Sequence, residues 1–285
     1  MPSDVAATRP SARRPRPRGG VLALGLVLLV FAGAVVTALF SARRIVGAVP
    51  GKGGLLSVAA TGSGFLVGTT TGAFASSDGR TWSPVQALAG PSPVAGDGGR
   101  VLAVSGRALV ATTDLRTVAP VATLPDVPTA VAAGPDGDAY VIARSGELFR
   151  VDAGGNAVRA GRPGPTSALG LAVVGTTPPV VYAAGLGTGL WRSDDGGGRW
   201  SRLLATPAQA ILPGAGSPDR ILLGTPGGLL VTRDGGRSWR LSALQVPVRG
   251  IALSGGRYYA LGEDRLLLVS PDGERDWRPV AAGGR

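Results

Sequence analysis

The sequence predicts an all-β protein, a single β-propeller of about six four-stranded blades, preceded by one N-terminal transmembrane helix. Three observations predict it: a short motif rich in Asp, Gly and Trp recurs at nearly constant spacing, apolar segments alternate with glycine turns, and an uncharged apolar stretch lies near the N-terminus. The expected parts are a cytoplasmic Arg/Pro-rich tail (1–18), a transmembrane anchor (19–42), a linker (43–53) and the propeller (54–283).

The recurring motif has the form S/T-x-D-x-G-x-x-W. Complete copies span Ser193 to Trp200 and Thr232 to Trp239, and a shortened copy, SSDGRTW, begins at Ser76. A fourth copy, SPDGERDW, carries Glu274 where the motif has glycine. The motif residues are Ser76, Asp78, Trp82, Ser193, Asp195, Gly197, Trp200, Thr232, Asp234, Gly236, Trp239, Ser270, Asp272 and Trp277.

The spacing of the motif sets the expected number of blades. With two weaker echoes at Asp114 and Asp152, six aspartates follow one another at intervals of 36, 38, 43, 39 and 38 residues. Such a period matches a four-stranded propeller blade. Before each aspartate lies an apolar run that reads as two strands around a short turn. Whether residues 45–54 add a further strand stays open at this stage.

The N-terminal region predicts a membrane anchor. Residues 19–40 contain no charged side chain, and such a run of 22 residues is long enough to span a bilayer. Five arginines precede it, which favours a cytoplasmic N-terminus and an extracytoplasmic propeller. A long cleaved signal peptide is the alternative, because small residues surround Ser41 and Ala42.

Composition excludes several kinds of chemistry. The chain has no Cys and no His, which removes thiol nucleophiles, disulfides, imidazole bases and nearly all zinc, copper and haem sites. Of the net charge of +11, residues 1–44 contribute +6, from seven Arg against one Asp, and the remaining +5 is spread along the chain. Without a basic stripe or an aromatic platform, nucleic-acid binding is not expected. The DGG turns lack the carboxylate density of calcium loops, so we expect no metal and no cofactor.

The in-phase motifs resemble those of the bacterial neuraminidase repeat, or Asp-box, superfamily over roughly residues 52–283. The chain is most similar to the non-catalytic branch, which includes propellers that help to assemble photosystem II. The resemblance implies that the motif residues are structural. Asp and Ser or Thr bind turn amides, glycine permits positive φ, and Trp fills a gap between strands. In this superfamily these turns lie on the rim opposite the ligand-binding face.

The same superfamily contains sialidases, whose chemistry needs an arginine triad, a Tyr nucleophile with a Glu partner and an acidic proton donor. Their Arg-Ile-Pro element is missing here, and the nearest string is Arg44-Ile45-Val46. The tyrosines, each expected in the second strand of a blade, are Tyr140, Tyr182, Tyr258 and Tyr259. A non-enzymatic protein is therefore expected, with a sialidase-like glycoside hydrolase or glycan-binding propeller as the alternative.

Candidate binding residues lie where loops gather at one mouth of the axial channel. These are the loops between second and third strands and the links between blades. Four arginines on different predicted blades occupy them: Arg107, Arg144, Arg162 and Arg249. Together they could form a basic rim for an acidic peptide or another anionic ligand, although solvated turn residues are the simpler interpretation.

The sequence thus predicts a membrane-anchored, extracytoplasmic propeller that binds or assembles proteins without catalysing a reaction. Its expected partners are the lipid bilayer, through residues 19–42, and an envelope protein or anionic ligand. Closed propellers have few free strand edges, so we expect a monomer.

Overall fold

The computed structural model of the chain describes residues 47–96, 99–164, 168–214 and 217–280. Both the predicted cytoplasmic tail (1–18) and the predicted anchor (19–42) lie outside the described residues. Within the described ranges, no helix is long and apolar enough to cross a membrane.

Residues 47–280 form six antiparallel sheets of four strands each, and each sheet is one blade. Blade 1 consists of β1 (Leu55–Thr61), β2 (Gly64–Thr69), β3 (Gly72–Ser76) and β4 (Ser83–Ala89). Blade 2 consists of β5 (Val94–Gly96), β6 (Val101–Ser105), β7 (Ala108–Thr112) and β8 (Ala119–Thr123). Blade 3 consists of β9 (Pro128–Ala133), β10 (Ala139–Ala143), β11 (Leu148–Val151) and β12 (Ala157–Gly161), with a 3-10 turn (Pro135–Gly137) after β9.

The second half of the ring repeats this pattern. Blade 4 consists of β13 (Gly170–Val174), β14 (Val180–Gly185), β15 (Gly189–Ser193) and β16 (Ser201–Leu204). Blade 5 consists of β17 (Ala210–Gly214), β18 (Ser217–Thr225), β19 (Gly228–Thr232) and β20 (Arg240–Leu241). Blade 6 consists of β21 (Val248–Ser254), β22 (Arg257–Gly262), β23 (Leu267–Ser270) and β24 (Arg278–Pro279).

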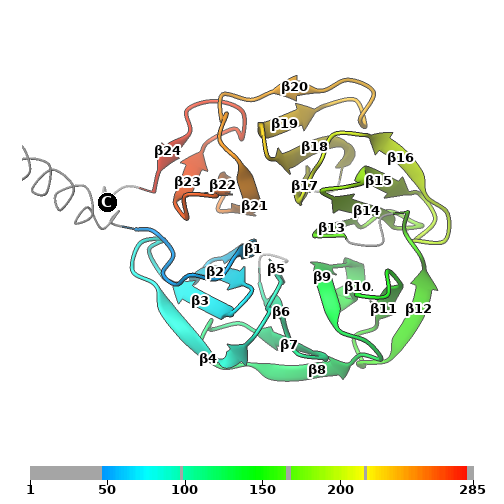
Figure 1. The fold of residues 1–285 in the computed structure, drawn as a ribbon. Coiled ribbons are helices and arrows are strands. Elements are labelled where there is room, and N and C mark those ends of the chain that lie inside the picture. The colour runs from blue at the N-terminus through cyan, green and yellow to red at the C-terminus, as the bar shows by residue number, and fades with distance from the viewer. Residues whose placement is uncertain (1–46, 97–98, 165–167, 215–216, 281–285) are drawn as a thin grey trace, which may run out of the picture. The chain divides into compact units, whose positions relative to one another are not determined.

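The blades are arranged in a ring with the first strand of each blade nearest the axis (Figure 1). This arrangement confirms the predicted six-bladed, all-β propeller. In every blade the four strands are consecutive in the chain, and residues 47–53 form no strand. The described part of residues 45–54, which begins at Gly47, therefore adds no strand to a blade.

Packing between blades explains why the strands are apolar on both faces. Six clusters of buried side chains lie between successive blades, one at each interface around the ring. Side chains alternate along a strand, so adjacent residues enter different clusters. Leu66 on β2 packs toward blade 2, whereas Val67 packs toward blade 6. The three inner strands of each blade are therefore largely apolar on both faces, whereas the outermost strands are mostly exposed.

The segment before β1 closes the ring between blades 6 and 1. From the turn after β22, the guanidinium of Arg265 donates to the carbonyls of Val49 (2.7 Å), Gly53 (2.7 Å) and Pro50 (2.8 Å). In return, the backbone N–H of Val49 donates to the carbonyl of Arg265 at 3.0 Å. The Val49 side chain is buried in the cluster between the two blades. Residues 47–53, which were expected to be only a linker, thus belong to the closing interface.

Replacing Arg265 should weaken this closure. Arg265→Met removes three charge-assisted hydrogen bonds, and we expect the free energy of unfolding to fall by about 2–4 kcal/mol. The measurement is urea unfolding followed by tryptophan fluorescence. Arg257→Met, an exposed arginine on the same blade, is the matched control and should change the midpoint little. Equal midpoints for both variants would show that Arg265 does not hold the ring closed.

Candidate functional site

A cavity runs along the propeller axis. Its volume is about 610 Å³, and its lining comes from the first strands of all six blades and the residues beside them. These strands contribute mostly backbone and small apolar side chains. Arg249 is the only charged residue among the described residues that line the cavity.

The antiparallel sheets give the ring two chemically different ends. Loops between second and third strands, together with the links between blades, lie at one end, which we call the mouth. Loops between first and second strands and between third and fourth strands lie at the other end. The recurring motif occupies the latter loops, so we call this the box end.

Two of the predicted arginines, Arg107 and Arg162, are exposed at the mouth and bind backbone carbonyls. The Nε of Arg107 donates to the carbonyl of Leu124 at 2.9 Å. The Nη2 of Arg162 donates to the carbonyl of Ser145 at 2.7 Å, which places it beside the loop that carries Arg144. Each guanidinium is therefore oriented by the protein and keeps further N–H groups for other acceptors.

Arg144 lies between these two. Asp126, in the link between blades 2 and 3, accepts the backbone N–H groups of Ser145 (2.8 Å) and Val127 (2.6 Å). These bonds, with that from Ser145 foremost, and the positive charge of Arg144 lower the pKa of Asp126. Asp126 thereby fixes the loop that presents Arg144. The structure thus places Arg107, Arg144 and Arg162 along adjoining blades, and we call these three residues the mouth arc.

Arg249 does not join the mouth arc. It lies at the start of β21 on blade 6, where its Nη1 donates to Oε1 of Gln209 at 2.6 Å and its Nη2 to Oε1 of Glu263 at 2.6 Å. Its side chain is 28 % exposed. The binding rim of four arginines stays a prediction, and within it Arg249 is paired with a carboxylate in its own blade.

Exposed apolar side chains share the mouth with the arc. Leu186, in the loop between β14 and β15, is 39 % exposed, and Val246, in the link between blades 5 and 6, is 40 % exposed. The mouth therefore combines positive charge on blades 2 and 3 with apolar surface on blades 4 to 6, a mixture found in protein–protein interfaces.

The motif residues at the box end bind one another and their own turns. In each of the four motif turns the hydroxyl of the Ser or Thr donates to the Asp carboxylate, over 2.7 to 3.1 Å. In the second complete motif, on blade 5, Thr232 Oγ1 also accepts the N–H of Gly236 at 3.0 Å, and the indole of Trp239 donates to the carbonyl of Gly236 at 3.1 Å. These groups are occupied within the turn, which leaves them poorly suited to hold a ligand.

One box glycine is required by space. Gly197 has φ of 110°, and a Cβ built on it would lie 2.3 Å from Cδ2 of Leu148 on blade 3. A side chain here would have to displace a buried leucine. The box turn therefore contributes to the contact between blades 3 and 4.

Turn amides lower the pKa of the motif carboxyls. The pKa of Asp78 falls to about 2, because its carboxylate accepts the N–H of Thr81 and that of Arg80. The pKa of Asp195 is lowered mainly by the N–H of Arg199, and that of Asp234 mainly by the hydroxyl of Ser238. These carboxylates are therefore held ionised for the turn and are unsuitable as general acids near neutral pH.

The tyrosines occupy the second strands, as expected. Tyr140 lies on β10, Tyr182 on β14, and Tyr258 and Tyr259 on β22. Burial raises the pKa of Tyr182 to about 12, and its hydroxyl donates to the carbonyl of Pro218 at 2.9 Å. A nucleophilic tyrosine would need the opposite shift.

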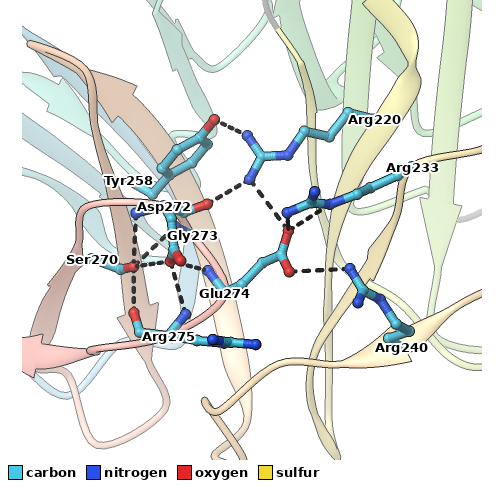
Figure 2. Close-up of polar contacts among 9 residues, drawn as sticks. All are labelled: Arg220, Arg233, Arg240, Tyr258, Ser270, Asp272, Gly273, Glu274 and Arg275. Carbon is cyan, nitrogen blue, oxygen red and sulfur yellow. Dashed lines mark hydrogen bonds and ion pairs between the residues drawn. The ribbon is translucent and has the colours of Figure 1, made fainter.

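Sequence reasoning missed a polar group at the box end of blades 5 and 6 (Figure 2). Glu274 accepts hydrogen bonds from Arg233 at 3.0 Å and from Arg240 at 3.2 Å, and Arg220 lies 3.7 Å away. Only the glutamate in place of the motif glycine marked this site in the sequence. Its arginine partners lie 34 to 54 residues away, so no local pattern could reveal them.

Comparison with known proteins supports the fold. No family model matches the chain, and neither does any curated protein. YCF48 from Cyanidioschyzon merolae is 16 % identical, covering 81 % of this chain and 86 % of that one, with a TM-score of 0.52. YCF48 bound to a D1 peptide is 17 % identical, covering 78 % of this chain and 94 % of that one, with a TM-score of 0.48. A GH74 xyloglucanase from Xanthomonas campestris is 22 % identical. The match covers 75 % of this chain and 36 % of the xyloglucanase chain, with a TM-score of 0.45. At 16 % identity, the similarity to YCF48 from Cyanidioschyzon merolae establishes the β-propeller fold alone.

Removing one box hydroxyl tests the structural role of these turns. Thr232→Val keeps the side-chain volume but leaves the N–H of Gly236 without its acceptor, and Thr232 is only 2 % exposed. We expect the free energy of unfolding to fall by about 1–3 kcal/mol in urea. Thr206→Val, at an exposed threonine, is the control and should change it by less than about 0.5 kcal/mol. Indistinguishable variants would contradict the role assigned to the hydroxyl.

The motif carboxyls should also set the acid limit of stability. A lowered folded-state pKa contributes stability that is complete above the unfolded pKa and is lost as pH falls through the folded value. For Asp78 this window runs from about pH 4 down to about pH 2. We expect the Tm of the wild type to fall across this window and that of Asp78→Asn to fall less steeply from a lower starting value. Asp219→Asn, at an exposed carboxylate, should retain the wild-type profile.

Proposed function

We propose that this chain is a membrane-anchored, extracytoplasmic propeller that binds an acidic segment of another envelope protein at its mouth and catalyses no reaction. The anchor is supported by the uncharged stretch at 19–40 and the arginines before it. Membership of the non-catalytic branch of the Asp-box superfamily is supported by the recurring motif and by the shared hydroxyl-to-carboxylate bond in its turns.

The mouth arc is the observation that carries the proposal. Arg107, Arg144 and Arg162 are exposed on adjoining blades, and backbone contacts orient two of them. Guanidinium groups bind carboxylates in a planar, bidentate manner, so an acidic peptide segment fits this surface. Exposed Leu186 and Val246 on the far side of the mouth offer apolar contacts that a protein partner can use.

The axial cavity favours binding over hydrolysis. Glycosidases commonly place two carboxyl groups about 5 to 9.5 Å apart around the scissile bond. Among the described residues that line the cavity there is no carboxylate, and Arg249 is already bound to Glu263. The tyrosine with the most strongly raised pKa, Tyr182, is buried between blades 4 and 5 rather than at the mouth.

A pull-down from detergent-solubilised membranes tests this function. The bait is the tagged full chain, compared with a triple variant of the mouth arc, Arg107→Ala with Arg144→Ala and Arg162→Ala. We expect the variant to recover its protein partner at least tenfold less efficiently, and wild-type recovery to fall as salt is raised.

The matched control removes the same charge elsewhere. Its substitutions are Arg116→Ala, Arg199→Ala and Arg237→Ala, all at exposed arginines of the box end, and recovery should equal that of the wild type. Arg249→Ala should have a smaller effect than the triple variant. An unchanged partner list for the triple variant would contradict binding at the mouth arc. Binding of the wild type to glycan arrays without any protein partner would favour the glycan-binding alternative.

A further inference from the structure

The motif turn of blade 6 departs from the others in a way that exposes positive charge. Glu274 occupies the position of Gly197 and Gly236 in the complete motifs. In those motifs the Trp indole donates to the glycine carbonyl, at 2.8 and 3.1 Å. The indole of Trp277 is buried without a hydrogen-bond partner in the described structure. Blade 6 has thus lost a local bond while gaining a carboxylate, and such breaks of a local rule concentrate at functional or strained sites.

The Glu274 carboxylate holds two arginines of blade 5 at the surface (Figure 2). Glu274 itself is only 15 % exposed, whereas the side chains of Arg233 and Arg240 are 62 % and 63 % exposed. Beneath them, the guanidinium of Arg220 lies 4.8 Å from the ring centre of Tyr258, a cation–π contact. Three guanidiniums surround one carboxylate, so positive charge remains in excess and faces solvent.

More exposed arginines continue this surface across blade 6. Arg257 begins β22, Arg275 follows Glu274, and Arg278 begins β24. We call the five exposed arginines of this region the box patch. They are Arg233, Arg240, Arg257, Arg275 and Arg278.

Acidic groups also lie here, and the comparison with the opposite blades shows which charge dominates. At the box end of blades 5 and 6, Arg220 and Arg237 add to the five patch arginines. The carboxylates there are Asp219, Asp234, Asp272, Glu274 and Asp276. The box end of blades 3 and 4 carries Arg150, Arg192 and Arg199 against Asp136, Asp138, Asp152, Asp194 and Asp195. Among these described residues, positive charge therefore exceeds negative on the side of blades 5 and 6, whereas negative exceeds positive on the side of blades 3 and 4.

The chain enters the propeller beside this patch. The carbonyl of Gly47 accepts the indole N–H of Trp82 at 3.1 Å, which places Gly47 at the motif turn of blade 1. In the same turn, Nε of Arg80 donates to the carbonyl of Val280, two residues after Arg278. The box patch therefore borders the interface between blades 6 and 1, where the described chain begins.

Only four residues, 43–46, separate Gly47 from the end of the predicted anchor at 42. Five residue steps of extended chain reach about 17 Å at most. Lipid headgroups fill roughly the first 6 Å beyond the hydrocarbon core. The box end beside Gly47 would therefore lie within about 11 Å of the headgroups, which is close to a Debye length of ~8–10 Å.

From this chain length and charge we infer that the box patch docks on the phosphates of anionic lipids in the membrane that holds the anchor. This inference rests on the proposed anchor. Each arginine near an anionic bilayer is attracted by about 1 kcal/mol, and the tether keeps the patch within reach of the surface. Docking directs the box end toward the bilayer and leaves the mouth arc facing the aqueous phase, where a protein partner can reach it.

Fluorescence quenching in nanodiscs tests the docking, and the absence of cysteine allows single labelling sites. Pro271→Cys labels an exposed position beside the box patch, and Pro226→Cys labels an exposed loop at the mouth. Each labelled full chain is placed in nanodiscs of phosphatidylcholine with or without phosphatidylglycerol, containing lipid with a nitroxide headgroup. We expect at least threefold more quenching at 271 than at 226 in the anionic discs, and loss of most of that difference in 0.5 M salt.

A charge variant and its matched control make the test specific. Arg257→Gln with Arg275→Gln and Arg278→Gln should at least halve quenching at 271, whereas Arg116→Gln with Arg199→Gln and Arg202→Gln, at exposed arginines of blades 2 and 4, should reduce it much less. Equal quenching at both labels, or quenching indifferent to anionic lipid, would overturn the docking. Quenching that needs two chains per disc would assign the patch to a second copy and overturn it as well. A chain that fails to enter nanodiscs would contradict the proposed anchor. Failure of the anchor can therefore be distinguished from failure of the docking.

Discussion

The propeller depends on the seam between blades 6 and 1, where the ring must close on itself. Every blade is made of consecutive strands, so no strand from one end of the chain completes a blade begun at the other. Closure falls instead to Arg265, which donates to three carbonyls ahead of β1, and to Val49, which is buried in the same interface. Opening this seam would expose the apolar faces of both blades to water.

The antiparallel sheets then separate structural from recognition surfaces. At the box end, hydroxyls and carboxylates of the motif are occupied by amides of their own turns, so they hold loops in place. At the mouth the turns are short, and arginines on blades 2 and 3 are exposed. Blade 6 is the exception, because Glu274 leaves its turn and binds arginines of blade 5.

Much of the fold was predictable because its signals are local. Ser193, Asp195 and Trp200 bind one another or their own turn within a few residues, so their spacing alone marks a blade. The candidate site was predictable only in part. Antiparallel topology indicated that Arg107, Arg144 and Arg162 share the mouth, but the pairing of Arg249 joins it to Gln209, 40 residues away.

The sequence by itself determined the repeat, the number of blades and the tyrosines on second strands. Each blade is formed by consecutive residues, so its turns and its apolar strands can be recognised from short stretches of sequence. Only the tertiary structure decided how the ring closes and where charge gathers. The carbonyl that receives Nε of Arg265 lies 216 residues away, and Glu274 meets its arginines across two blades. Contacts between residues so far apart produce no recognisable sequence pattern, because they form only when the blades pack around a common axis.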